Sequence, residues 1–230
     1  MIRTAADGGV RRVIFDRPER RNALTRDGLA TLRTAVEDAT EPVVLLTGAG
    51  SAFCAGADLD VVAELDEEEA ADFARLGQSV GNALAESESV VVAGVDGPAR
   101  GGGVELALAC DLRVATPNAS FAETGVKLGL FGAWGGTVRL PGIVGQGEAM
   151  DLALSGRTVD AEEALRMGLV SRIVDDPAAV ASELAESDHD ALTVLKERLR
   201  DDAPTEDQER REAEAFATLV GHAALGERDE

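Results

Sequence analysis

The chain has 230 residues, of which 45% are hydrophobic, and its formal net charge at pH 7 is −21. This length suits one domain, or a domain with a small appendage, and the apolar content is enough for a sizeable core. The acidic excess repels phosphates and therefore argues against a nucleic-acid partner. No apolar run approaches the ~18 residues of a membrane span, and no apolar signal stretch opens the chain, so we expect a soluble, cytoplasmic protein without a membrane partner.

The basic residues are almost all arginines. Only Lys127 and Lys196 are lysines, which leaves 20 arginines among the 22 basic residues. A large acidic excess keeps a protein soluble at high salt, where screening shortens charge repulsion to a range of about 3 Å. We therefore interpret the charge as an adaptation to a salty cytoplasm, that is, as a halophilic trait.

The cysteines and histidines predict no metal site. Cys54 and Cys110 each lie among small apolar residues, which is typical of small core side chains rather than of a disulfide framework. His189 and His222 stand far apart in polar surroundings. Because no ligand spacing for zinc exists, we expect no metal.

Apolar periodicity and capping residues predict an alternation of strands and helices. The predicted elements are, in chain order, a strand at 13–15, a helix that Thr25 caps and that runs to Val36, a buried strand at 43–47, an acidic helix at 64–86, a strand within 89–97, a helix from 104, a strand at 112–116, helices at 148–154 and 161–167, and helices from 178 onward. This order is typical of an α/β core followed by an α-helical tail. We predict a core over residues 1–174 and a short acidic helical region over 175–230.

The glycines of this chain fit the common glycine motifs of nucleotide-binding proteins and hydrolases poorly. After the strand at 43–47, Gly48 and Gly50 begin a dinucleotide fingerprint, but Phe53 occupies the position of its third glycine. Gly77 to Gly81 match the G-x-S-x-G pattern of a hydrolase nucleophile, with Ser79 at its centre. That motif requires a strand before the serine, whereas an acidic helical pattern precedes it here, which favours an ordinary helical serine.

Two strand ends run into small residues. They are VVLLTGAGSAFCAGAD at 43–58 and SVVVAGVDGPARGGGVEL at 89–106. Small residues allow a ligand to approach backbone amides, and the second segment opens a helix whose first amides lack internal partners. Two such amides can hold an oxygen that carries developing negative charge, although two tight turns would explain the composition equally well.

Five segments in one order resemble the crotonase (enoyl-CoA hydratase/isomerase) superfamily. They are RPERRNAL, LLTGAGSAFCAGADL, VDGPARGGGVELALACDLRVAT, LGLFGAWGGTVRL and DAEEALRMGLVSRIV, and the similarity covers about 13–174. The resemblance implies a spiral of ββα turns with an α-helical C-terminal region that builds a homotrimer or a dimer of trimers. It also implies an acyl-CoA thioester as the substrate and no separate cofactor.

The resemblance implies roles for particular residues. The backbone amides of Ala57 and Gly102 match the family's oxyanion hole, and Glu105 matches one of the two acid–base glutamates of its hydratases. Asp58, Leu59 and Asp60 match the family's CoA site, and Arg20 and Arg21 fall where its nucleotide-contacting loop lies, although a solvated surface position explains the two arginines equally well. The apolar residues Leu130, Phe131, Ala133 and Trp134 are candidates for an acyl pocket. Core packing is an alternative role for each of the last four.

The second glutamate of the hydratases is replaced by Gly125. Hydration divides proton transfer between two groups, and each positioned group is worth ~10²–10⁴ in rate. Glu123, two residues earlier, is a candidate replacement if the loop follows another path. If it does not, we expect slow hydration, and we expect the change Gly125→Glu to increase it.

One loop, ETGVKLGLF at 123–131, is similar to the same segment of 1,4-dihydroxy-2-naphthoyl-CoA synthases. There the glycine leaves room for a bicarbonate that acts as base, which would place bicarbonate near Gly125. Those synthases lack the acid at position 105 and use a tyrosine, whereas this chain has Glu105 and contains no tyrosine.

We therefore expect an enzyme of the enoyl-CoA hydratase/isomerase type. The alternatives are an isomerase, thioester hydrolase or decarboxylase with a single glutamate, or a non-catalytic acyl-CoA-binding homologue.

Overall fold

The computed structural model describes residues 1–222. It opens with an antiparallel hairpin of strands β1 (Ile2–Asp7) and β2 (Val10–Phe15), which turns at Gly8 and Gly9 with positive φ at both. The sequence pattern did not predict β1. This strand lies at the edge of the sheet and most of its side chains are exposed, so it carries no apolar alternation.

A six-stranded sheet forms the centre of the molecule, in the order β1-β2-β3-β4-β6-β9. After the hairpin, every neighbouring pair in this sheet is parallel. Its remaining strands are β3 (Val43–Gly48), β4 (Val90–Val95), β6 (Leu112–Ala115) and β9 (Arg172–Ile173). A second sheet of three strands contains β5 (Pro98–Arg100), β7 (Ser120–Ala122) and β8 (Val159–Asp160). Parallel strands joined by helices confirm the predicted α/β class.

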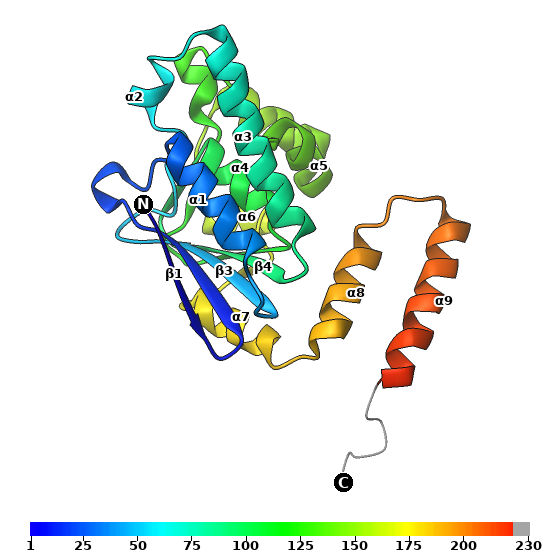
Figure 1. The fold of residues 1–230 in the computed structure, drawn as a ribbon. Coiled ribbons are helices and arrows are strands. Elements are labelled where there is room, and N and C mark those ends of the chain that lie inside the picture. Colours follow the sequence, from blue (N-terminus) through cyan, green and yellow to red (C-terminus); the bar gives the residue numbers. More distant parts are fainter. Residues whose placement is uncertain (223–230) are drawn as a thin grey trace.

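Helices cover both faces of the larger sheet (Figure 1). On one face lie α1 (Arg26–Glu37), α3 (Glu67–Glu86) and α4 (Gly102–Ala109), and α7 (Pro177–Ala185) packs on the other. Successive strand residues point to opposite faces, so Leu46 joins the core under α1 and α3, whereas Leu45 packs with Val180 of α7. The predicted cap is confirmed, because Thr25 accepts a hydrogen bond from the Gly28 amide.

Shorter elements complete the region around the glycine-rich segments. They are η1 (Pro18–Arg20), α2 (Leu59–Val62), η2 (Thr124–Leu128), α5 (Gly136–Ser155) and α6 (Ala161–Arg166). Helix α5 begins well before the predicted residue 148. Its first half is rich in glycine and contains Pro141, and Gly145 has a φ of 79°, so two helical pieces meet at a kink that breaks the sequence pattern.

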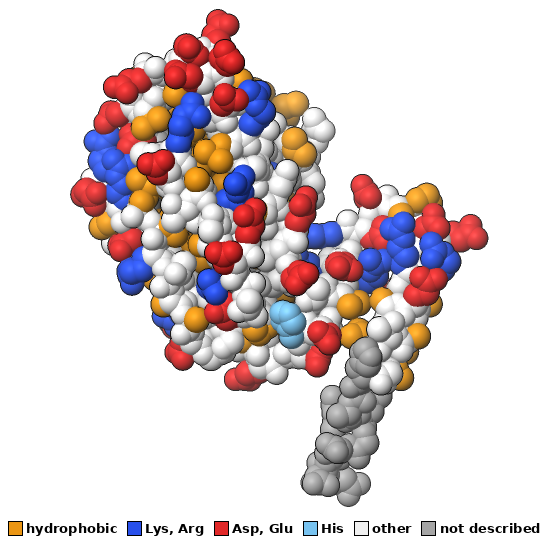
Figure 2. Space-filling view, viewed as in Figure 1, with side chains coloured by type: hydrophobic (Ala, Val, Ile, Leu, Met, Phe, Trp, Pro, Cys, Tyr) orange, Lys and Arg blue, Asp and Glu red, His pale blue; other side chains and the backbone are white. Residues whose placement is uncertain are grey.

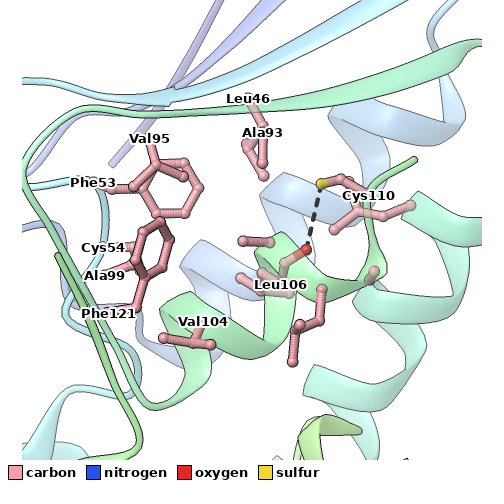
Figure 3. Close-up of a cluster of buried hydrophobic side chains, with 14 of the residues drawn as sticks. Leu46, Phe53, Cys54, Ala93, Val95, Ala99, Val104, Leu106, Cys110 and Phe121 are labelled. Atoms are coloured by element: carbon pink, nitrogen blue, oxygen red, sulfur yellow. Dashed lines mark hydrogen bonds between the residues drawn. The ribbon is translucent and has the colours of Figure 1, made fainter. Parts of the chain in front are cut away.

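The core between the sheet and α4 holds both cysteines (Figure 3). Cys54 and Cys110 are buried and free, which confirms that they are small core residues. Burial raises the pKa of each thiol to about 12, so neither is a thiolate at neutral pH. Phe53 packs edge-on against Phe15, and this contact fixes the end of β3 where the small-residue loop begins.

Two further helices complete the described chain: α8 (His189–Leu199) packs beside β4, and α9 (Thr205–His222) extends beyond it (Figure 1). Lys196 anchors α8, donating to the carbonyls of Ser87 and Ser89 and pairing with Asp111 at 2.9 Å. The predicted division at residue 174 and the predicted trimer both stay predictions.

Acidic side chains are spread over the visible face among arginines and lysines (Figure 2). Of the helices in residues 1–222, none is both long and apolar enough to cross a membrane.

Candidate active site

The two small-residue loops lie side by side. The loop after β3 pairs with β5: the Phe53 amide donates to the Pro98 carbonyl at 3.1 Å, and the Arg100 amide donates to the Cys54 carbonyl at 2.9 Å. Gly56 makes the close approach possible, since a Cβ there would lie 2.8 Å from the Gly102 nitrogen, and its φ is 83°. The predicted meeting of the two loops is therefore present.

Two backbone amides at this junction are free. Among the described residues, no acceptor is found for the amide of Ala57 or for that of Gly102, whereas the neighbouring Asp58 amide donates to the Leu24 carbonyl. Gly102 is the first residue of α4, so its amide has no partner within the helix. Both Ala57 and Gly102 line a cavity of about 210 Å³.

Glu105 projects from the first turn of α4 and is almost fully buried. Its Oε1 atom accepts hydrogen bonds from the backbone amides of Trp134, at 2.9 Å, and Gly136, at 2.6 Å. Burial raises the pKa of this carboxyl, and the two amides and the charge of Arg139 offset part of the rise. The carboxyl is thus held by one oxygen, and Oε2 has no donor within residues 1–222.

Glycines surround the Glu105 carboxyl. A Cβ at Gly132 would lie 2.6 Å from its carboxyl carbon, and a Cβ at Gly136 would lie 2.8 Å from Oε1. Any side chain at these positions would displace the carboxyl from its two amide donors. Neither glycine is predicted as a site residue from the sequence, where their one signal is the glycine-rich run 132–136.

Glu123 lies just before η2, and its Oε1 atom is buried without a hydrogen-bond partner in the described part of the chain. Burial, together with the charge of Glu105, raises the pKa of Glu123 to about 8. A carboxyl in this state keeps its proton at neutral pH and can donate it.

Glu105 and Glu123 line the same cavity of about 370 Å³, between the η2 region and α5. Glu105 also lines the smaller cavity, next to Gly102 and Ala57, and the two cavities share the segment from Leu130 to Gly132. Glu105 is thus common to both cavities: the residues with free amides, Ala57 and Gly102, line the smaller one, and Glu123 lines the larger one.

Gly125 has no room for a side chain in this arrangement. A Cβ there would lie 2.9 Å from the Cα of Phe131 and 3.2 Å from the Leu130 carbonyl oxygen. The Leu130 amide donates to the Gly125 carbonyl, which closes this loop over η2. The expected gain from Gly125→Glu depended on a backbone path with room for the new side chain, and this backbone does not provide that room.

Trp134 and Phe131 have different environments. Trp134 is buried between α3 and α4: a Cβ at Gly77 would lie 2.1 Å from its ring, and one at Gly102 would lie 2.3 Å from it. Phe131 is largely exposed and lines both cavities. The close packing also explains the G-x-S-x-G match, because Gly77 and Ser79 lie inside α3, where no nucleophile turn exists.

The residues predicted at the CoA end lie together at the surface beside α2. Asp58 is buried and pairs with Arg17 at 2.6 Å and with Arg20 at 3.2 Å, and Arg20 also contacts Asp60. Burial alone raises the pKa of Asp58, but the hydrogen bonds from Arg17, the Asp60 amide and Arg20 leave that pKa below its usual value. Arg21 adopts a left-handed backbone conformation and is exposed. Leu59, the first residue of α2 and one of the predicted CoA-site residues, lines the smaller cavity.

Comparisons with known proteins show the family to which the chain is related. A family model for enoyl-CoA hydratase/isomerase matches residues 5–223. A crotonyl-CoA hydratase from Syntrophomonas wolfei is 41% identical over 165 residues, covering 70% of this chain and 64% of that protein. A short-chain-enoyl-CoA hydratase from Clostridium acetobutylicum is 40% identical over 174 residues, covering 74% of this chain and 67% of that protein. The matched part thus spans about two thirds of the length of these curated relatives.

A solved structure extends the similarity over almost the whole chain. The crystal structure of enoyl-CoA hydratase from Thermoplasma volcanium matches with a TM-score of 0.90 and 30% identity, covering 96% of this chain and 92% of that one. Both the sequence relationship and the fold confirm the resemblance inferred from the five motifs. The chain therefore belongs to the enoyl-CoA hydratase/isomerase family.

Proposed function

We propose that this protein adds water across the double bond of an enoyl-CoA thioester. The observation that carries the proposal is that Glu105 and Glu123 line one cavity, while Glu105 also lies beside the free amides of Ala57 and Gly102. Relatives named as enoyl-CoA hydratases support the acyl-CoA substrate. Two differently placed carboxyls near one pair of amide donors are what hydration of a conjugated thioester requires.

The thioester carbonyl oxygen accepts hydrogen bonds from the amides of Ala57 and Gly102. Attack at the β-carbon moves electrons onto this oxygen, and preorganised donors stabilise the resulting enolate. Loss of one such donor typically costs ~10²–10³ in rate. The Gly102 amide suits this role further because it begins α4, where the helix dipole favours negative charge.

Glu105 and Glu123 divide the proton transfers. Glu105 takes a proton from water through Oε2, and the hydroxyl oxygen bonds to the β-carbon as the π electrons shift toward the carbonyl. Glu123 then gives its proton to the α-carbon, and the carbonyl re-forms. The pKa of about 8 for Glu123 supports its role as the acid. The proton gained by Glu105 returns to Glu123 through the cavity that both carboxyls line.

The CoA part lies toward α2, where Ala57 and Leu59 line the smaller cavity. Because Arg20 is engaged by Asp58 and Asp60, we assign contact with the CoA phosphates chiefly to Arg21. The reaction as written uses no cofactor, and the bicarbonate site near Gly125 stays a prediction.

A homotrimer or a dimer of trimers is part of the proposal. Helices α8 and α9 expose large apolar side chains, among them Leu195, Leu199 and Phe216. Sedimentation in molar salt is expected to give a trimer or hexamer, and a monomer at all concentrations would contradict this part.

Incubation with crotonyl-CoA and longer enoyl-CoAs tests the activity. We expect the 3-hydroxyacyl-CoA to form, with one atom of solvent oxygen in the product when the water is isotopically labelled. Binding of enoyl-CoA without turnover of any chain length would refute the proposal and favour the non-catalytic homologue. Formation of free CoA or of a shifted double bond would instead identify the hydrolase or isomerase alternative.

A further inference from the structure

We propose that the larger cavity binds the distal part of an extended, uncharged acyl group, so that the enzyme prefers acyl chains longer than four carbons. The inference rests on the proposed function and specifies its substrate class. The cavity measures about 370 Å³ and begins at the two carboxyls. Apolar side chains form most of its wall: Val126, Leu130, Phe131, Leu140, Pro141, Ala149, Met150, Ala153 and Leu154.

The cavity runs from the buried interior to the surface. Glu105 at one end is 1% exposed, whereas Met150 and Leu154 on α5 are 50% and 70% exposed. An acyl chain whose reacting carbons lie beside Glu105 can therefore extend along α5 toward solvent. Because the cavity is open at this end, it does not limit the length of the acyl chain.

A four-carbon acyl group would leave this space largely empty. In a crotonyl group only the terminal methyl lies beyond the β-carbon. The cavity has room for about twelve groups of the size of a water molecule, at roughly 30 Å³ each. Each further methylene group that moves from water into the cavity contributes ~0.8 kcal/mol to binding. Because ~1.4 kcal/mol corresponds to a factor of ten, this contribution raises the affinity about fourfold per methylene.

The lining of the cavity disfavours acyl groups that end in a carboxylate. Its ionisable lining residues are Glu105 and Glu123, and neither arginine nor lysine is among the lining residues in the described range. Thr137 and Gln146 are its uncharged polar members. A terminal carboxylate that enters the cavity would therefore lie among apolar side chains without a cation to pair with it.

The test is a series of straight-chain enoyl-CoAs of four, six, eight and ten carbons, with an eight-carbon substrate that ends in a carboxylate. We expect kcat/KM to rise by about fourfold per added methylene until the cavity is full, and the carboxylated substrate to be at least ~10-fold poorer than its uncharged counterpart. A flat or falling series from four to eight carbons, or equal rates with the carboxylated substrate, overturns the inference.

Two variants on α5 locate the effect. Ala153→Phe fills the cavity and should lower the ratio of eight-carbon to four-carbon kcat/KM at least ~10-fold, since several methylenes lose their site. Val138→Phe is the matched control, because Val138 lies on the same helix, is 80% exposed and does not line the cavity. An unchanged ratio in Ala153→Phe overturns the inference. If the phenylalanine of Ala153→Phe prevents folding, Ala153→Leu is used in its place.

If no enoyl-CoA is hydrated, the proposed activity fails, but the cavity remains testable by binding. Dissociation constants for saturated acyl-CoAs of four to ten carbons should then fall about fourfold per methylene. Equal dissociation constants along that series overturn the inference independently of any turnover.

Discussion

Glu105 and Glu123 line the same cavity, but only Glu105 is held in place by backbone amides. Burial raises the pKa of both carboxyls, but the amides of Gly136 and Trp134 offset part of the rise at Glu105, whereas the neighbouring charge of Glu105 adds to it at Glu123. In the proposed mechanism these unequal environments let Glu105 act as the base and Glu123 as the acid.

This separation predicts how activity depends on pH. Because the pKa of Glu123 is raised to about 8, the protein holds a proton donor below that pH and loses it above, so kcat should fall as pH rises through about 8. Glu123→Gln cannot give up a proton and should lower kcat at least ~10²-fold at pH 7. Exposed Glu162→Gln is the matched control, and its pH profile should overlie that of the native protein. A native activity that stays constant from pH 7 to 9.5 would contradict the role of Glu123.

A second prediction concerns Gly56, which allows the loop carrying Ala57 to approach Gly102. In Gly56→Ala the new Cβ would lie 2.7 Å from the Arg100 carbonyl oxygen and 2.8 Å from the Gly102 nitrogen, at a φ of 83°. The two amides must move apart, so kcat should fall by ~10²–10³ with a smaller change in affinity for acyl-CoA. Gly142→Ala is the control, since a Cβ there meets nothing. Full activity of a correctly folded Gly56→Ala would rule out the paired amides as the oxyanion hole.

The third prediction replaces the expectation that Gly125→Glu restores a missing acid. Because a Cβ at 125 would meet the backbone of Phe131 at 2.9 Å, the variant should melt at a lower temperature and should hydrate no faster than the native protein. Steady-state rates on crotonyl-CoA and a thermal melt check both parts. Faster hydration by this variant would indicate that the loop adopts another path and that Glu123 is not the second acid.

The fourth prediction concerns salt. With −21 charges per chain, lowering the salt lengthens the range of repulsion from about 3 Å at 1 M to about 30 Å at 0.01 M. The melting temperature should therefore fall steeply between these conditions, and spermine or another polycation at low salt should recover part of the loss. A melting temperature that is independent of salt would contradict the halophilic interpretation.

Sequence patterns predict those parts of this fold that local chemistry determines. The apolar runs at β3 and β4 are predicted because both faces of these strands are buried, and the cap at Thr25 is predicted because one side-chain hydrogen bond determines it. The exposed strand β1 and the glycine-rich first half of α5 are missed, because neither shows an apolar period.

The site is predicted in part for the same reason. The family resemblance points to Glu105, Gly102 and Ala57, which the structure places around one cavity. The position of Glu123 depends on how η2 and the loop to Phe131 fold over α4 and α5, and residue spacing alone does not give that path. The two amides that hold Glu105 come from residues about 30 positions away, which no local pattern reveals.

The central claim is that the Glu105 carboxylate is the base that activates water for an enoyl-CoA held in this site. The most direct measurement is the kcat for enoyl-CoA hydration by Glu105→Gln, together with the dissociation constant of a saturated acyl-CoA. Glutamine can still accept the Trp134 and Gly136 amides through its oxygen, so the fold and the binding site are retained. The account predicts a loss in kcat of at least ~10²-fold with the dissociation constant essentially unchanged. Hydration at the native rate by Glu105→Gln would contradict it, and Glu105 would then serve only to join α4 to α5.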